Sequence, residues 1–318
     1  MYDNNPIPIT TKLDNPLTSI HCNPDPYMIY HEGVYYCYST GYHGVNVLRS
    51  DNFNSFEHMG FALKDDSQKA YWAPAVIFYN GLFYMYYSSV LNGETDPHRE
   101  FLKVAVADNP LGPFTWKRTL FDEFTIDAHV VEKNGELYLF YSPNITEGEK
   151  IGTIIALDKL IDPFTPLGKP RIIVYPTIEQ EIHIRNRSGY NRDWYTIEGA
   201  FYFEYGGTGF LMYSANAFEH EDYFVGYCTC DSSVPLDEAV FQKYPDDKTY
   251  NPLIGKDNFV TGCGHNSIIT GPNKELFIVY HGRSRVEAHK PGGLDDGRRL
   301  CVSEIKVKGK ELILARRK

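Results

Sequence analysis

The stretch DAHVVEKNGELYLFYS, residues 127–142, decides the fold, because four other segments of the chain repeat its pattern. Each copy runs from an apolar strand through a short turn into an aromatic strand. The other copies are DPYMIYHEGVYYCYS (25–39), APAVIFYNGLFYMYYS (73–88), EGAFYFEYGGTGFLMYS (198–214) and HNSIITGPNKELFIVYH (265–281). Apolar and aromatic runs bounded by Gly, Asn or Pro are typical of β-hairpins.

A constant internal distance relates the copies to one another. In the first four, a glycine follows the first residue by eight positions, and in the fifth Asn273 takes that place. The copies begin 48 to 71 residues apart, and a third strand follows each of the first four. All-β units at such spacing are typical of propeller blades of about four strands. We therefore predict an all-β, five-bladed β-propeller, with residues 1–318 as one domain. A β-sandwich also has many short strands, but does not explain the constant distance.

The charge of the chain argues against two classes of partner. Its net charge of −10 would be repelled by nucleic acid and by an anionic membrane surface. The basic pair Arg298-Arg299 and the basic triplet Arg316–Lys318 are interpreted as solvated surface charge. The first residues have neither a basic start nor an apolar stretch, which predicts a cytoplasmic protein without a signal peptide.

The first position of each repeat carries the chemistry. These positions are Asp25, Ala73, Asp127, Glu198 and His265. In a propeller, equivalent positions lie on a ring around the central axis, so three carboxyl groups and one imidazole are expected to converge. A single aspartate there is explained by a turn, but three acids at one repeat position are not explained by packing, because buried carboxylates are costly.

Converging carboxylates suit the hydrolysis of a glycosidic bond. An inverting enzyme uses one carboxylic acid to protonate the leaving oxygen and one carboxylate to activate water, roughly 6.5–9.5 Å apart. A third carboxylate beside the acid would raise its pKa by repulsion and keep it protonated near neutral pH.

In order along the chain, the motifs resemble those of glycoside hydrolase family 43. They are Asn23-Pro24-Asp25-Pro26, Trp72-Ala73-Pro74, Ile126-Asp127-Ala128-His129, Ile197-Glu198-Gly199-Ala200 and Gly264-His265-Asn266-Ser267. The resemblance covers roughly residues 20–305. It implies a five-bladed propeller in which Asp25 is the general base, Asp127 modulates pKa and orientation, and Glu198 is the general acid. It also implies inversion of configuration. Ala200 departs from the family pattern, where proline commonly follows Glu-Gly.

The resemblance also implies roles for other residues. His265 matches a histidine that lies beside a hydrated metal ion, often calcium, on the axis; the alternative is a histidine that hydrogen-bonds within the channel. No cofactor beyond that ion is expected. Trp72, Arg283, His129 and Phe201 are expected to line the sugar pocket. For Arg283, a surface ion pair is the alternative.

The expected activity is that of an exo-acting α-L-arabinofuranosidase on arabinose-containing oligosaccharides. The alternatives are a β-D-xylosidase, an enzyme with both activities, and, more remotely, a non-catalytic sugar-binding propeller, which would not need all three acids. The sequence does not define the oligomeric state. The longest insertion, residues 171–195, precedes Glu198 directly and is expected to cover the pocket and to influence the preferred substrate length.

Overall fold

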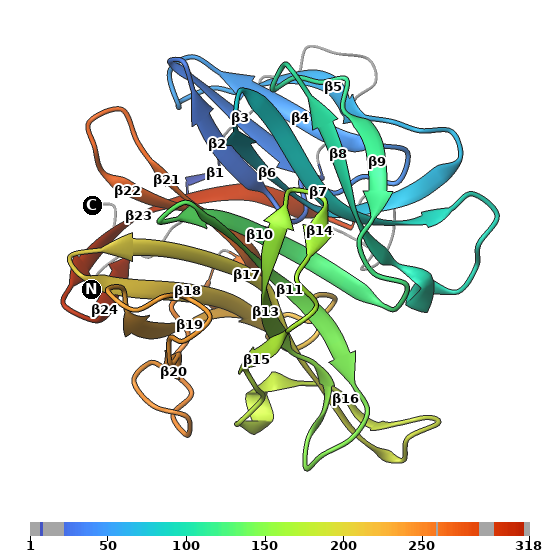
Figure 1. Cartoon of the computed structure of the whole chain (residues 1–318). Helices are drawn as coiled ribbons and strands as arrows, with labels where there is room; N and C mark the ends of the chain where they lie inside the picture. The colour runs from blue at the N-terminus through green and yellow to red at the C-terminus, as the bar shows by residue number, and fades with distance from the viewer. Residues whose placement is uncertain (1–6, 9–21, 259, 286–295, 315–318) are drawn as a thin grey trace.

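The computed structural model describes residues 7–8, 22–258, 260–285 and 296–314. Its strands form four sheets, the largest of which has 11 strands and contains two blades. The five blades lie around a common centre, and the colours of Figure 1 follow the ring from blade to blade. The predicted five-bladed β-propeller is confirmed. In each blade the strand that opens the repeat copy is the innermost, and the strands that follow it pair outward with antiparallel neighbours.

The first two blades are four-stranded meanders. Blade one contains β2 (Tyr27–His31), β3 (Val34–Ser39), β4 (Val45–Ser50) and β5 (Glu57–Leu63). Blade two contains β6 (Gln68–Tyr79), β7 (Leu82–Leu91), β8 (Phe101–Ala107) and β9 (Thr115–Thr119), with the short 3-10 helix η1 (Pro97–Arg99) between β7 and β8.

The third and fourth blades carry the insertions. Blade three contains β10 (Thr125–Lys133), β11 (Glu136–Ile145), β13 (Ile155–Asp162), β14 (Thr165–Pro166) and β15 (Arg171–Val174). Blade four contains β17 (Arg192–Tyr205), β18 (Thr208–Ala215), β19 (Phe224–Asp231) and β20 (Gln242–Lys243). Between them lie the 3-10 helix η2 (Glu179–Glu181) and β16 (Ile182–Arg187), which pairs with the start of β17.

The fifth blade brings the two ends of the chain together. It contains β21 (Val260–Thr270), β22 (Leu276–Ser284), β23 (Arg298–Lys308), β24 (Glu311–Leu314) and the N-terminal β1 (Ile7–Pro8). Both β24 and β1 pair with β23, so residues from the start of the chain complete the last blade.

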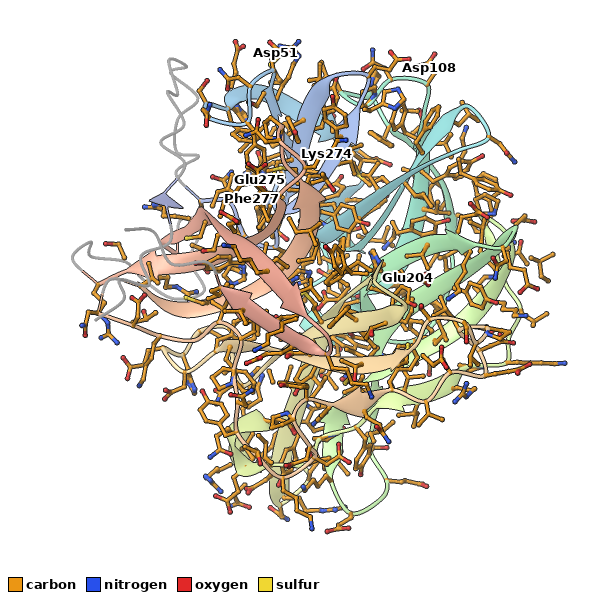
Figure 2. All side chains as sticks on the ribbon, turned by 90° about the vertical axis from the view of Figure 1, so that its left-hand side faces the viewer. Asp51, Asp108, Glu204, Lys274, Glu275 and Phe277 are labelled. Atoms are coloured by element: carbon orange, nitrogen blue, oxygen red, sulfur yellow. The ribbon has the colours of Figure 1, made fainter. Side chains whose placement is uncertain are left out.

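Five apolar clusters hold the ring together, one between each pair of neighbouring blades. Strand β7 shows why. Its side chains alternate, so that Phe83, Met85 and Tyr87 pack towards blade one while Tyr84 and Tyr86 pack towards blade three. A blade thus needs an apolar residue at nearly every position, as the aromatic runs of the sequence supply. Figure 2 shows side chains throughout the spaces between the ribbons.

Strand β12 (Ile151–Thr153) joins blades three and four directly. It is antiparallel to the end of β11 and parallel to the start of β17. Gly152 sits at its centre with φ 145°, and a Cβ there would overlap the backbone of Tyr195. Only glycine permits this close approach of two strands.

We expect Gly152→Ala to destabilise the protein by about 2–4 kcal/mol, because it combines a strained backbone with overlap against the next strand. Chemical denaturation measures the change. Gly81→Ala is the matched control: its φ is also positive, but its Cβ would meet nothing within 4 Å, so only backbone strain of about 1 kcal/mol is expected. Equal losses in the two variants would show that the contact with β17 is not tight.

Candidate active site

Irregularities of the innermost strands create the site. Strands β6, β10, β17 and β21 each contain a β-bulge where residues of the inner strand outnumber those of its partner. The bulged residues Ala73, Asp127, Gly199 and His265 have φ between 43° and 63°, and Asp25, just before β2, has φ 53°. Four of the five are not glycine, although this conformation strains residues with a side chain. Such strain is concentrated at functional sites.

Backbone N–H groups at several of these positions donate to a side chain of the preceding blade. The N–H of Ala73 donates to Thr40 Oγ1 at 2.8 Å, and that of His265 donates to Ser214 Oγ at 2.7 Å. The N–H of Asp25 donates to His281 Nδ1 at 3.1 Å. These side chains satisfy buried donors and fix the ring. We did not predict them, although Ser214 and His281 close their repeat copies.

The structure corrects the position of Glu198 in the repeat. Gly199, not Glu198, has the positive φ and takes the bulge position that Asp127 takes in its strand, while Glu198 pairs in the register of Trp72. The repeat alignment was displaced by one residue in blade four because Gly206 and Gly207 are adjacent and either matches the turn glycine. Glu198 therefore enters the site from a different backbone position than the two aspartates.

Asp25 is held as an anion by several donors. Its Oδ2 accepts from the hydroxyl of Thr40 at 2.6 Å, and its Oδ1 lies 3.2 Å from Nη1 of Arg298. Burial opposes ionisation, but the charge of Arg298, together with His265 and His281, outweighs it and holds the pKa of Asp25 well below its usual range. A carboxylate that stays ionised suits a general base.

Asp127 lies near the same nitrogen of His265 as Asp25 does. His265 Nδ1 is 3.5 Å from Oδ1 of Asp25 and 3.8 Å from Oδ2 of Asp127. Asp127 Oδ2 also accepts the N–H of Gly199 at 3.0 Å, which ties it to the residue after Glu198. Burial, followed by the charges of Glu198 and Asp25, raises the pKa of Asp127 well above its usual range.

Glu198 is placed to carry a proton at neutral pH. Burial raises its pKa to about 7, and the charges of Asp25 and Glu219 act in the same direction, whereas a hydrogen bond from Tyr223 opposes them. The Tyr223 hydroxyl donates to Oε1 of Glu198 at 2.7 Å. The ring of Tyr223 stacks on His281 at 5.8 Å, so the partner of the acid is itself fixed by blade five.

Arg298 was interpreted as solvated surface charge, and the structure corrects this. Its side chain is 12% exposed and lies in the site beside Asp25 and Asp296. Its guanidinium carbon is 4.8 Å from the centre of the Phe218 ring. The sequence carried no signal for this role, because Arg298 belongs to the third strand of its blade and lies outside the repeated motif.

Arg283, expected to line the sugar pocket, has its hydrogen-bond donors directed at protein oxygens. It is 1% exposed, and its Nε, Nη1 and Nη2 donate to the Asp296 carbonyl, the Phe218 carbonyl and the Asp296 carboxylate. Asp296 in turn accepts from Nε of Arg298 at 2.8 Å. Arg283 thus positions the cation that faces Asp25.

The other predicted pocket residues are divided between the site and the core. Trp72 is half-buried at the register of Glu198 on β6. His129 is buried with both nitrogens occupied, Nδ1 by the Tyr27 hydroxyl at 3.0 Å and Nε2 by the Tyr202 carbonyl at 3.1 Å. Phe201 packs on His129 with ring centres 4.2 Å apart, within the apolar cluster between blades four and five. His129 and Phe201 therefore contribute to the buried packing that supports the site.

The ligand atoms around His265 differ from the coordination that calcium prefers. That ion takes six to eight oxygen ligands, whereas His265 offers one imidazole between two carboxylates that are engaged with other partners. The described residues contain no group of three or more His, Cys, Asp or Glu side chains arranged to hold a metal. The axial ion stays a prediction.

The insertion before Glu198 is anchored firmly. Glu181 is fully buried, accepts the N–H groups of Thr177 and Ile178, and forms an ion pair with Lys243 of blade four. Further along, Arg187 donates to Nε2 of His98 in η1 at 2.7 Å. The insertion thus links blades two and four across blade three.

Comparisons with known proteins agree with this geometry. The family model described as "Glycosyl hydrolases family 43" matches residues 13–311. The extracellular exo-α-(1→5)-L-arabinofuranosidase of Streptomyces avermitilis is 28% identical over 239 residues, 74% of this chain and 47% of that protein. α-L-Arabinofuranosidase 43 of Humicola insolens is 26% identical over 241 residues, with the same coverage of 74% and 47%. The crystal structure of a thermostable family-43 glycoside hydrolase is 30% identical, with a TM-score of 0.75, and the match covers 94% of this chain and 95% of that one.

The length and the localisation of these relatives bear on this chain. The chain spans about half the length of the curated relatives it matches. The prediction of a cytoplasmic protein is wrong by this comparison, because the Streptomyces avermitilis relative is named as an extracellular enzyme. Within the described residues, no helix is long and apolar enough to cross a membrane.

Proposed function

Because this chain belongs to family 43 of the glycosyl hydrolases, we propose that it is an inverting, exo-acting α-L-arabinofuranosidase that releases terminal arabinose from oligosaccharides. One observation carries the proposal: three carboxyl groups from blades one, three and four lie in one site, those of Asp25 and Asp127 buried and that of Glu198 half-buried, and their pKa values are driven in opposite directions. The names of the two curated relatives support arabinose as the sugar.

The proposed reaction is a single displacement. Asp25 removes a proton from a water molecule as its oxygen attacks the anomeric carbon, and Glu198 gives its proton to the glycosidic oxygen as the bond to that carbon breaks. The pentose leaves with inverted configuration and the leaving group departs as an alcohol. Exchange with solvent then returns the proton from Asp25 to Glu198. Arg298 keeps Asp25 ionised, and Asp127 holds the backbone beside Glu198.

The activity is tested with a panel of 4-nitrophenyl glycosides. We expect the α-L-arabinofuranoside to be cleaved at least tenfold more efficiently than the β-D-xylopyranoside, and NMR to detect the β-anomer of arabinose first. Preference for the xyloside would replace the proposed substrate by its alternative. Release of the α-anomer first would contradict the single displacement.

The pH profile follows from the two functional pKa values. Glu198 must be protonated, so kcat/KM is expected to fall as the pH rises above about 7. Asp25 must be ionised, and since its pKa is depressed, the acidic limb should lie below the usual range of an aspartate. Arg298→Met removes the cation and should move the acidic limb upward. An unchanged acidic limb in that variant would show that Arg298 does not control Asp25.

A further inference from the structure

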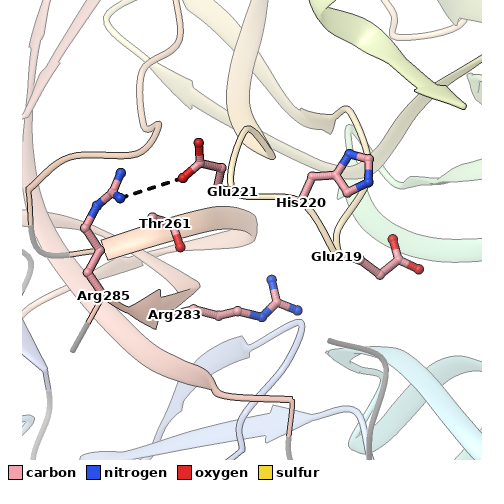
Figure 3. A pocket seen from close by; sticks show the side chains of 6 residues that line it. All are labelled: Glu219, His220, Glu221, Thr261, Arg283 and Arg285. Carbon is pink, nitrogen blue, oxygen red and sulfur yellow. Dashed lines mark ion pairs between the residues drawn. The ribbon is translucent and has the colours of Figure 1, made fainter. Parts of the chain in front are cut away.

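A cavity of about 330 Å³, a volume within the range of small-ligand sites, adjoins the loop between β18 and β19. It is lined by Glu219, His220, Glu221, Thr261, Arg283 and Arg285 (Figure 3). Three of these residues belong to the β18–β19 loop, which ends at Tyr223, the hydrogen-bond partner of Glu198. Glu219 follows Phe218, whose ring centre lies 4.8 Å from the guanidinium carbon of Arg298 in the site, and its charge raises the pKa of Glu198.

The two acidic residues of the cavity differ in their partners. Glu221 is neutralised by Lys256, 2.6 Å from its Oε1, and by Arg285, 3.7 Å from its Oε2. Glu219 forms no ion pair within the described part of the chain, and its Oε2 is buried without a hydrogen-bond partner there. Figure 3 shows it on the side of the cavity away from the Glu221–Arg285 pair. A buried carboxylate oxygen without a donor is costly, so a bound donor would be favoured.

The position of the acid defines what binds there. A general acid lies within hydrogen-bond distance of the glycosidic oxygen, so the leaving group begins on the Glu198 side of that bond. The guanidinium group of Arg283 is not free to reorient towards a ligand, because its three nitrogen atoms already donate hydrogen bonds to protein oxygens. Glu219 is a charged residue of this cavity whose Oε2 has no hydrogen-bond partner within the described residues, so a hydroxyl of a bound sugar could supply the missing donor after a small rotation of the side chain.

Resting on the proposed function, we propose that this cavity binds the leaving-group sugar of the oligosaccharide and that Glu219 accepts hydrogen bonds from its hydroxyl groups. Glu219 would then determine the preference for a sugar over a simple alcohol as leaving group. Its carboxylate contacts the leaving sugar and takes no part in proton transfer.

The test compares two substrates with equally poor leaving groups, α-1,5-L-arabinobiose and methyl α-L-arabinofuranoside. Both depend on Glu198 for protonation, but only the disaccharide fills the cavity. For Glu219→Ala and Glu219→Gln, each measured at its own pH optimum, we expect kcat/KM for arabinobiose to fall about 10- to 100-fold, mainly through KM. The value for the methyl glycoside should change less than about threefold.

The controls separate the possible failures. Asp222→Asn alters the same loop at a carboxylate that faces Lys256 at 2.7 Å and does not line the cavity, so the ratio of the two substrates should stay constant. Equal losses for both substrates in both Glu219 variants would overturn the subsite and leave the proposed function intact. A wild-type protein inactive on both arabinosides would overturn the proposed function itself, and the subsite with it.

Discussion

Replacement of Glu198 by alanine is expected to lower kcat on arabinobiose by about 10²- to 10⁴-fold, the usual contribution of a general acid. The loss should be much smaller on 4-nitrophenyl α-L-arabinofuranoside, because nitrophenolate departs without needing a proton. The basic limb of the pH profile, assigned to Glu198 with a pKa of about 7, should disappear. Steady-state kinetics over a pH series measures all three effects.

Glu204→Gln provides the matched control for this variant. Glu204 lies on the same strand, β17, and its carboxylate pairs with Lys133 and the Tyr202 hydroxyl outside the site. Its replacement should leave kcat within about twofold, as for other surface charges. If Glu198→Ala lost the same factor on both leaving groups, the residue would not be the proton donor.

For Asp25→Asn we also expect a loss of about 10²- to 10⁴-fold in kcat, with a different signature. The base acts on water, so arabinobiose and the nitrophenyl substrate should lose activity by the same factor. The amide keeps the shape of the side chain and can still face Arg298, which retains Asp296 as its counter-ion. Thermal unfolding should therefore show a folded protein.

Asp51→Asn is the control in blade one. Asp51 is an exposed carboxylate at the surface (Figure 2). It forms an ion pair with Arg49, and its replacement should leave the rate unchanged. Full activity of Asp25→Asn would remove the base from the mechanism. A loss confined to arabinobiose would instead place Asp25 on the leaving-group side.

Much of the architecture was predictable because it repeats. The apolar alternation of each copy defines two strands, and the turn glycines define where the chain reverses. Repetition of the unit places the first residue of each copy near a common axis, so Asp25, Asp127 and His265 could be brought together without coordinates. The displaced position of Glu198 shows the limit: two adjacent glycines in one turn leave the register open, and only the pairing of β17 with β18 resolves it.

The residues outside the repeated motif were not predictable in the same way. Arg298 reaches Asp25 from the third strand of blade five, and Tyr223 reaches Glu198 from the end of a loop. Arg283 and His129 had been expected to line the pocket, and both have their polar atoms bonded to protein groups. The sequence indicates that a side chain is able to bind a ligand. It does not indicate which protein groups already form hydrogen bonds with that side chain.

The sequence by itself determined the all-β propeller, the family and the three carboxyl groups on which the proposed reaction depends. Periodic patterns and ordered motifs are local properties of the chain, so they can be read without coordinates. The tertiary structure alone decided how each acid holds its proton, because that depends on burial and on charges from distant blades. Arg298 keeps Asp25 ionised and burial keeps Glu198 protonated near neutral pH, and neither effect is encoded at those two positions.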